Sequence, residues 1–202
     1  MTLDEEIARE FDYAVLEKIF GPFVRFHADI LYDCAKEANN GAIVELGTYK
    51  GAGAITLALG TRRGNNLLVY TIDDRLNRKG WIGEQYTDED YLVFEENVKR
   101  ADVHIVPVVC DVFDAAENYR LIWKTGIALL YWTLGIRDHF ALDFEAWSKY
   151  VVPGGFFIAK DAGQGELGTE PAIQEALRTG EWERELCRGG ISVLRRVNER
   201  SR

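Results

Sequence analysis

Residues 42–60 read AIVELGTYKGAGAITLALG, and this stretch decides the fold. It opens with a short apolar run that ends in Glu45, passes through Gly47, Gly51 and Gly53, and continues into an alanine- and leucine-rich segment with helical spacing. The pattern predicts a buried strand, a glycine-rich turn and the start of a helix. Such a turn lets a ligand lie against the backbone, because glycine has no Cβ and the helix N-terminus offers unpaired N–H groups.

The glycine spacing distinguishes this turn from a dinucleotide-binding one. The dinucleotide fingerprint is G-x-G-x-x-G, whereas here Glu45 is followed by glycines at 47, 51 and 53. A wider loop with an acid at the strand end suits a ligand that presents a cation and hydroxyl groups rather than a pyrophosphate. On this loop alone, an ordinary strand-to-helix turn in another α/β protein is the alternative.

The motif E-x-G-x-x-x-G-x-G resembles the nucleotide loop of class I S-adenosylmethionine-dependent methyltransferases. The resemblance implies that Glu45 and the glycine loop, with Thr48 and Tyr49 inside it, hold the methionine part of that cofactor. A second stretch, DFEAWSKYVVPGGFFIAKD at 143–161, is similar to the end of the catalytic core in a branch of small-molecule O-methyltransferases. Many members of that branch act on hydroxyls of sugars or natural products.

An acidic pair also follows the next predicted strand. Residues 67–72 form this strand, which ends at Asp73 and Asp74, and Asp73 stands 20 positions after Gly53. A βαβ unit places an acid at this distance to accept hydrogen bonds from ribose hydroxyls. A carboxylate suits the task because it can accept from both vicinal hydroxyls. An acid in a plain strand-end turn is the alternative.

A third strand is predicted over 103–110 and is followed by Asp111 and Val112. The resemblance implies that Asp111 meets the exocyclic amine of adenine and that Val112 flanks the ring. Trp81, in the polar loop 75–90, could stack on adenine or pack the loop down. Open α/β sheets bind ligands at the carboxyl ends of their strands, so acids after three strands indicate a binding site at that edge.

The rest of the chain completes a prediction of fold class. Two helices are predicted within 1–40, and the first has a Thr2–Glu5 capping box and the apolar repeat Leu3, Ile7, Phe11 and Val15. Another helix is predicted after Thr87, followed by a fourth strand at 127–132 and a helix with Phe140, Phe144 and Trp147 on one face. A Pro-Gly-Gly turn then leads into a fifth strand at 156–159, and a helix from Thr169 and strands at 182–187 and 191–197 complete the chain. We expect an α/β fold: a Rossmann-like, seven-stranded, mostly parallel sheet with a C-terminal antiparallel hairpin, helices on both faces and two N-terminal helices. One domain is expected over 1–202, with a helical segment at 1–40 and a cofactor-binding core at 41–202.

Methyl transfer from a sulfonium is an in-line displacement that requires alignment and, for an alcohol, a general base. His139 and Asp161 are the best-placed candidates for this base. Asp138 and Lys160 are the second-choice candidates, and Lys160 could instead orient an anionic substrate or pair with Asp161. Trp132 and Tyr131, at the end of the fourth strand, would wall the methyl pocket with aromatic surface.

The sequence departs from the resembled branch in its metal ligands. There the fourth strand usually ends in Asp-Gly-x-His and the fifth in His-Asp, whereas here 132–135 read Trp-Thr-Leu-Gly and 160–161 read Lys-Asp. Magnesium takes several oxygen ligands, which Asp161 alone does not supply, so we expect no tightly bound metal. The departure keeps two other hypotheses open: a binding or scaffold protein that has lost methyl transfer, and an enzyme with non-methyl chemistry such as a cyclisation.

Composition limits the partners. A net charge of −9 without a basic run argues against nucleic-acid binding. No apolar run approaches the roughly 18 residues of a membrane span, and the acidic N-terminus is unlike a secretory signal. Three separated cysteines suggest reduced thiols in a cytoplasmic protein rather than a disulfide frame or a zinc site. The expected partner is a small-molecule acceptor, and the aromatic-rich first helices could pair two chains in a homodimer.

Overall fold

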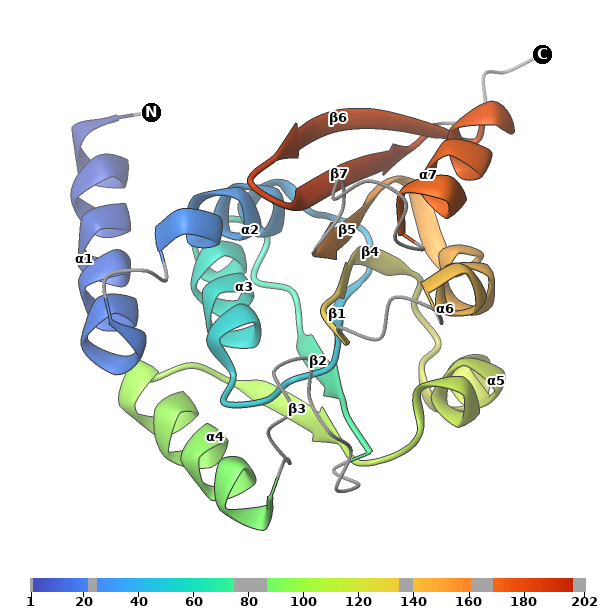
Figure 1. The fold of residues 1–202 in the computed structure, drawn as a ribbon. Helices are drawn as coiled ribbons and strands as arrows, with labels where there is room; N and C mark the ends of the chain where they lie inside the picture. Colours follow the sequence, from blue (N-terminus) through green and yellow to red (C-terminus); the bar gives the residue numbers. More distant parts are fainter. Residues whose placement is uncertain (1, 22–24, 75–86, 135–139, 161–168, 198–202) are drawn as a thin grey trace.

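The computed structural model describes residues 2–21, 25–74, 87–134, 140–160 and 169–197. In these ranges seven strands form one sheet in the order β3-β2-β1-β4-β5-β7-β6 (Figure 1). The strands are β1 (Ala42–Leu46), β2 (Val69–Ile72), β3 (Ile105–Val108), β4 (Ile127–Trp132), β5 (Val151–Lys160), β6 (Trp182–Arg188) and β7 (Ile191–Arg196). The helices are α1 (Leu3–Phe20), α2 (Arg25–Glu37), α3 (Ala52–Arg62), α4 (Asp88–Ala101), α5 (Val112–Ile122), α6 (Phe140–Ser148) and α7 (Thr169–Arg178).

The sheet is parallel except at its last strands. Neighbours from β3 through β2, β1 and β4 to β5 pair in parallel, and β7 pairs antiparallel with both β5 and β6. The chain moves outward from β1 to β2 and β3, and then returns to place β4 on the other side of β1. The strand order therefore reverses between β1 and β4, and sheets of this kind bind ligands at the carboxyl ends beside such a reversal. The predicted fold class, including the C-terminal antiparallel hairpin, is confirmed.

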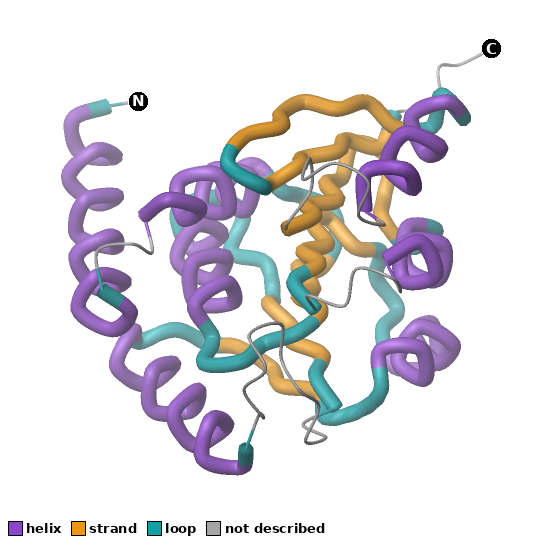
Figure 2. The backbone as a smooth tube through the Cα atoms, in the orientation of Figure 1, coloured by secondary structure: helices purple, strands orange, loops and turns teal. Residues whose placement is uncertain are grey.

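Helices cover both faces of the sheet (Figure 2). One core cluster joins the sheet to α1, α2, α3 and α4, and the other joins it to α5, α6 and α7. β1 shows how the sequence serves both clusters: Ile43 belongs to the first, and Val44 and Leu46 belong to the second. Successive side chains of a strand point to opposite faces, so a strand covered on both sides needs a continuous apolar run. Glu45 interrupts that run on the α3 face.

The first helix packs through a face that its apolar repeat does not mark. The Thr2–Glu5 capping box is present, but Ile7 and Phe11 are 60% and 64% exposed. The buried side carries Asp12, which is 0% exposed. Its carboxylate accepts hydrogen bonds from the Tyr32 hydroxyl and from the guanidinium groups of Arg62 and Arg63. These contacts connect α1 to α2 and to the end of α3.

β5 begins earlier than the predicted tight turn. It runs from Val151 through the Pro-Gly-Gly sequence at 153–155, where Gly154 has a φ of +76°. The register with β4 shifts across this segment, because Ile127 pairs with Val151 whereas Leu129 pairs with Phe156. The extra β5 residues make a bulge, so the glycines serve an irregular strand rather than a turn that precedes it.

Candidate functional site

The loop between β1 and α3 carries the predicted glycines. Gly47 and Gly51 have φ values of +86° and +88°, and the Gly51 N–H donates a hydrogen bond to the Thr48 carbonyl over 2.9 Å. Two features favour glycine at position 51. Its φ lies in the left-handed region, and an added Cβ would lie 2.6 Å from Phe94 Cδ2. The loop is therefore a closed turn, packed on one side by α4.

Glu45 lies beneath the first turn of α3. Its side chain is 1% exposed, and a Cβ on Gly53 would overlap Glu45 Oε1, so glycine at 53 leaves room for the carboxylate. Among the described residues, Glu45 Oε2 has no hydrogen-bond partner, and the same holds for Thr48 Oγ1 in the adjoining loop. Burial, followed by the negative charge of Asp73, raises the pKa of Glu45 well above its usual value, while Lys160 lowers it. A ligand cation placed here would favour the ionised carboxylate.

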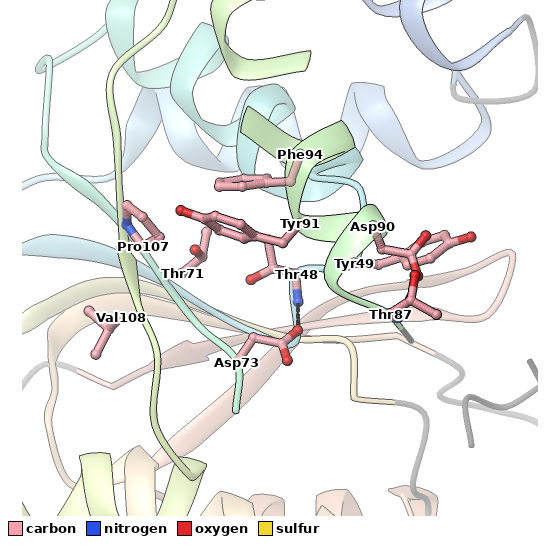
Figure 3. Close-up of a pocket in the computed structure, with 10 residues that line it drawn as sticks. All are labelled: Thr48, Tyr49, Thr71, Asp73, Thr87, Asp90, Tyr91, Phe94, Pro107 and Val108. Carbon is pink, nitrogen blue, oxygen red and sulfur yellow. Dashed lines mark hydrogen bonds between the residues drawn. The ribbon is translucent and has the colours of Figure 1, made fainter. Parts of the chain in front are cut away.

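Asp73 follows β2 and faces the same loop. Its Oδ2 accepts a hydrogen bond from the Thr48 backbone N–H over 2.8 Å (Figure 3). The charge of Asp73 also raises the pKa of Glu45, as expected for carboxylates near the ends of the adjacent strands β1 and β2. Two of the three predicted strand-end acids thus meet at the glycine loop.

A shallow pocket that opens to solvent lies between the sheet and the N-terminal half of α4. Tyr91 and Phe94 of α4 line one side, Pro107 and Val108 of β3 line another, and Asp73 lies at its edge (Figure 3). The walls are mostly apolar with a few polar groups, which is the mixture found in pockets for small organic ligands.

Asp111 is the N-cap of α5. Its Oδ1 accepts hydrogen bonds from the backbone N–H groups of Phe113 and Asp114 at 2.8 and 3.4 Å. Val112, the first residue of the helix, packs in the core. One Asp111 oxygen therefore serves the helix terminus, and the expected contacts of Asp111 and Val112 with adenine stay predictions.

Trp132 lies elsewhere than its predicted role requires. Its side chain is fully buried, Nε1 donates a hydrogen bond to Asp143 Oδ2 over 2.8 Å, and the ring packs edge-to-face against Phe140. The alternation of β4 explains this, because it turns Trp132 toward α6 and Tyr131 toward α3. A Cβ on Gly53 would lie 2.7 Å from Tyr131 Cε1. Tyr131, rather than Trp132, is therefore the aromatic residue of β4 beside the loop.

Several other predicted site residues can be placed only in part. Lys160 is the last residue of β5 and is half-buried, and its positive charge lowers the pKa of Glu45. Asp74 follows Asp73 and is half-buried. Asp138, His139, Asp161 and Trp81 lie outside the described residues.

Sequence reasoning missed the contribution of α4. Asn97 Nδ2 donates a hydrogen bond to the Lys50 carbonyl over 3.0 Å, and Asp90 Oδ1 lies 3.4 Å from Lys50 Nζ. With Phe94 over Gly51, three α4 side chains hold the glycine loop. Their spacing of i, i+4 and i+7 marks one helix face, a signal that the sequence contained.

The described ranges hold no group of three histidine, cysteine, aspartate or glutamate side chains that could bind a metal ion. Cys34, Cys110 and Cys187 are free thiols. Within the same ranges, no helix combines the length and the apolar character needed to cross a bilayer.

Neither a family model nor a curated protein sequence matches the chain. Solved structures do. An O-methyltransferase from Bacillus cereus, in complex with S-adenosylhomocysteine, is 14% identical with a TM-score of 0.61 over 91% of this chain and 90% of that one. The TDP-rhamnose 3′-O-methyltransferase of calicheamicin biosynthesis is 19% identical, with a TM-score of 0.60 over 96% and 95%. The O-methyltransferase of tomaymycin synthesis from Streptomyces achromogenes, in complex with S-adenosylmethionine, is 14% identical, with a TM-score of 0.61 over 98% and 100%.

At these identities the likeness shows the fold. The chain has the fold of S-adenosylmethionine-dependent O-methyltransferases, and the similarity extends over nearly the whole length of both partners in each comparison.

Proposed function

We propose that this protein transfers a methyl group from S-adenosylmethionine to a small-molecule acceptor, at a hydroxyl oxygen and without a tightly bound metal. The observation that carries the proposal is the Glu45 carboxylate, which is buried at the glycine loop with Oε2 lacking a partner in the described part of the chain. Buried polar groups in folded proteins are almost always hydrogen-bonded, so an orphaned carboxylate oxygen at a strand end points to a missing cationic or donor group.

The residues present fit this cofactor. The unpartnered Glu45 Oε2 and Thr48 Oγ1 can take donors from its methionine end, and the loop has no Cβ at Gly51 or Gly53. Asp73, beside the loop, would accept from the ribose hydroxyls. Tyr49, 41% exposed, lines the adjoining pocket. Adenine contacts at Asp111 and Val112 complete the proposal.

When bound, S-adenosylmethionine supplies an electrophilic methyl group on a sulfonium. The chain's own contribution is to hold that end in place and to exclude water from it, because alignment contributes most to an in-line displacement. Tyr131, buried beside Gly53, provides apolar surface there, in the role that was predicted for Tyr131 and Trp132 together. The base proposed for an alcohol acceptor is His139 or Asp161, and Lys160 would orient an anionic acceptor.

Calorimetric titration with S-adenosylmethionine and S-adenosylhomocysteine tests the cofactor proposal. Asp73→Ala should weaken binding by about 1–3 kcal/mol through loss of hydrogen bonds to ribose. Asp33→Ala removes the same charge from α2, where Asp33 pairs with Arg9, and should leave affinity unchanged. Absence of binding to the wild-type protein, or equal binding by Asp73→Ala, would refute the assignment.

A screen of hydroxylated metabolites for methyl transfer then tests the reaction. Cofactor binding with no acceptor found at any hydroxyl would favour the scaffold or non-methyl alternatives. We further propose a cytoplasmic enzyme of small-molecule metabolism that acts without nucleic-acid or membrane partners. Homodimer formation through the first helices belongs to the same proposal, and light scattering at several protein concentrations would test it.

A further inference from the structure

The helix α4 holds the glycine loop from one side. Asp90, Phe94 and Asn97 lie on successive turns of one face, and each contacts the loop: Asp90 reaches Lys50 Nζ, Phe94 covers Gly51, and Asn97 binds the Lys50 carbonyl. Of the three, Asn97 makes the contact least expected of a helix interior, because it is a buried amide directed at the backbone of another element.

Asn97 fixes one end of a peptide group. Asn97 is only 5% exposed, and its Nδ2 donates a hydrogen bond to the Lys50 carbonyl over 3.0 Å. On the other side of the same peptide, the Gly51 N–H donates to the Thr48 carbonyl over 2.9 Å. The Lys50–Gly51 peptide is thus held at its oxygen by α4 and at its hydrogen by the turn.

The turn that this peptide closes is strained. Tyr49 has a φ of +48°, a left-handed conformation that a residue with a large side chain adopts at a cost. Such strain persists only where the surroundings enforce it, and it gathers at ligand-binding sites. The described contacts that hold this turn include the Thr48–Gly51 bond within it, the hydrogen bond from the Thr48 N–H to Asp73, and the Asn97 bond to the Lys50 carbonyl.

We propose that Asn97 is a positioning residue for the cofactor: its amide pre-forms the Thr48–Gly51 turn, so that the loop is already shaped when S-adenosylmethionine arrives. The inference rests on the proposed function and adds a residue outside the glycine motif. A loop ordered in advance loses less conformational freedom on binding, which appears as higher affinity. Without the amide, the strained Tyr49 conformation competes with relaxed ones that do not bind.

The test compares Asn97→Leu with a matched control. Asn65 Nδ2 donates to the Ala38 carbonyl over 2.9 Å, so Asn65→Leu removes the same kind of side-chain-to-backbone bond where α2 meets the turn after α3. Both variants should lower the thermal midpoint. Only Asn97→Leu should raise the Kd for S-adenosylmethionine and S-adenosylhomocysteine, by about five- to tenfold, as expected for one lost hydrogen bond, whereas Asn65→Leu should stay within about twofold of wild type.

Asn97→Asp gives a second arm with nearly the same shape. Its carboxyl can donate to the Lys50 carbonyl when protonated and repels it when ionised. The Kd of this variant relative to wild type, measured at each pH, should therefore approach one as the pH falls. Comparison at matched pH cancels the titration of Glu45, which both proteins share.

Equal Kd values for Asn97→Leu and wild type, or a pH-independent ratio for Asn97→Asp, would overturn the inference. It would also be overturned if neither Asn97 variant folds while Asn65→Leu does, because Asn97 would then serve the fold. These results leave cofactor binding by the wild type intact. If the wild-type protein binds neither S-adenosylmethionine nor S-adenosylhomocysteine, the proposed function itself is refuted. That outcome differs from failure of the Asn97 inference, in which the wild type still binds.

Discussion

Replacing Glu45 by glutamine removes one negative charge beneath α3 and nearly preserves the shape of the side chain. The carboxylate is 1% exposed and Oε2 has no partner in the described residues, so in the protein without ligand its charge is poorly stabilised. In the proposed complex the same charge receives a donor from the cationic end of the cofactor. We therefore expect Glu45→Gln to change stability and affinity in opposite directions.

The affinity change follows from a hydrogen bond to a charged group. Such a bond contributes about 1.5–3 kcal/mol, so the Kd for S-adenosylmethionine should rise roughly 10- to 150-fold. The stability change depends on pH. The pKa of Glu45 is raised by burial and by Asp73, so the folded wild type binds a proton more tightly than the unfolded chain, and its stability falls as pH rises from 4.5 through the raised pKa. Glu45→Gln lacks this loss and should gain stability relative to wild type across that window.

Calorimetry and urea unfolding at several pH values measure the two effects. Glu117→Gln, on the exposed face of α5, removes an equal charge and should change neither. Because a bound cation favours the ionised form, wild-type binding should also release protons, detectable as a dependence of the binding enthalpy on the buffer. A variant that is less stable than wild type throughout and binds equally well would refute the reasoning.

Three further outcomes are expected. Gly53→Ala places a methyl group against Glu45 Oε1 and Tyr131 and should lower both cofactor affinity and, by about 1–3 kcal/mol, the free energy of unfolding measured in urea. Asp12→Ala leaves Arg62 and Arg63 without their shared partner and should cost about 2–3 kcal/mol, below the value for a fully buried pair because both guanidinium groups reach solvent; an altered cofactor affinity would contradict its purely structural role. Methyl transfer should persist with a chelator present, and a loss that added magnesium restores would show the metal prediction wrong.

Short-range signals account for what the sequence predicted well. Thr2 with Glu5 and Thr87 with Asp90 form capping boxes as local pairs, independent of the rest of the fold. The bounds of β4 match the prediction at 127–132, since a continuous apolar run in a parallel sheet has clear ends. The helix α5 and the capping role of Asp111 were not predicted, although an acid directly before a helix is an N-cap signal.

Long-range partners explain what the sequence could not predict. An acid such as Asp12 in an amphipathic helix is expected to face solvent, and only the arrival of Arg62 and Arg63 from the far end of α3 makes its burial favourable. With α1 held in this orientation, Ile7 and Phe11 of its apolar repeat face outward, whereas Val15 packs against the core. The hold of Asn97 on the glycine loop is of the same kind, since its partner lies 47 positions earlier.

Other buried polar groups of the chain provide a comparison for the hydrogen bonding of Glu45. Asp12 is as deeply buried, yet it accepts hydrogen bonds from three side chains, and the buried amide of Asn97 has its carbonyl partner. The fold thus supplies partners for these two groups even across 50 positions of sequence, although among the described residues Glu170 Oε2, Arg184 Nε and Ser192 Oγ also lack a hydrogen-bond partner. At the glycine loop it leaves Glu45 Oε2 and Thr48 Oγ1 without partners in the described residues. Glu45 and Thr48 differ from those residues in their place, at the carboxyl end of β1 beside the strand reversal where ligands bind in this fold class, and that place favours a ligand as the missing partner.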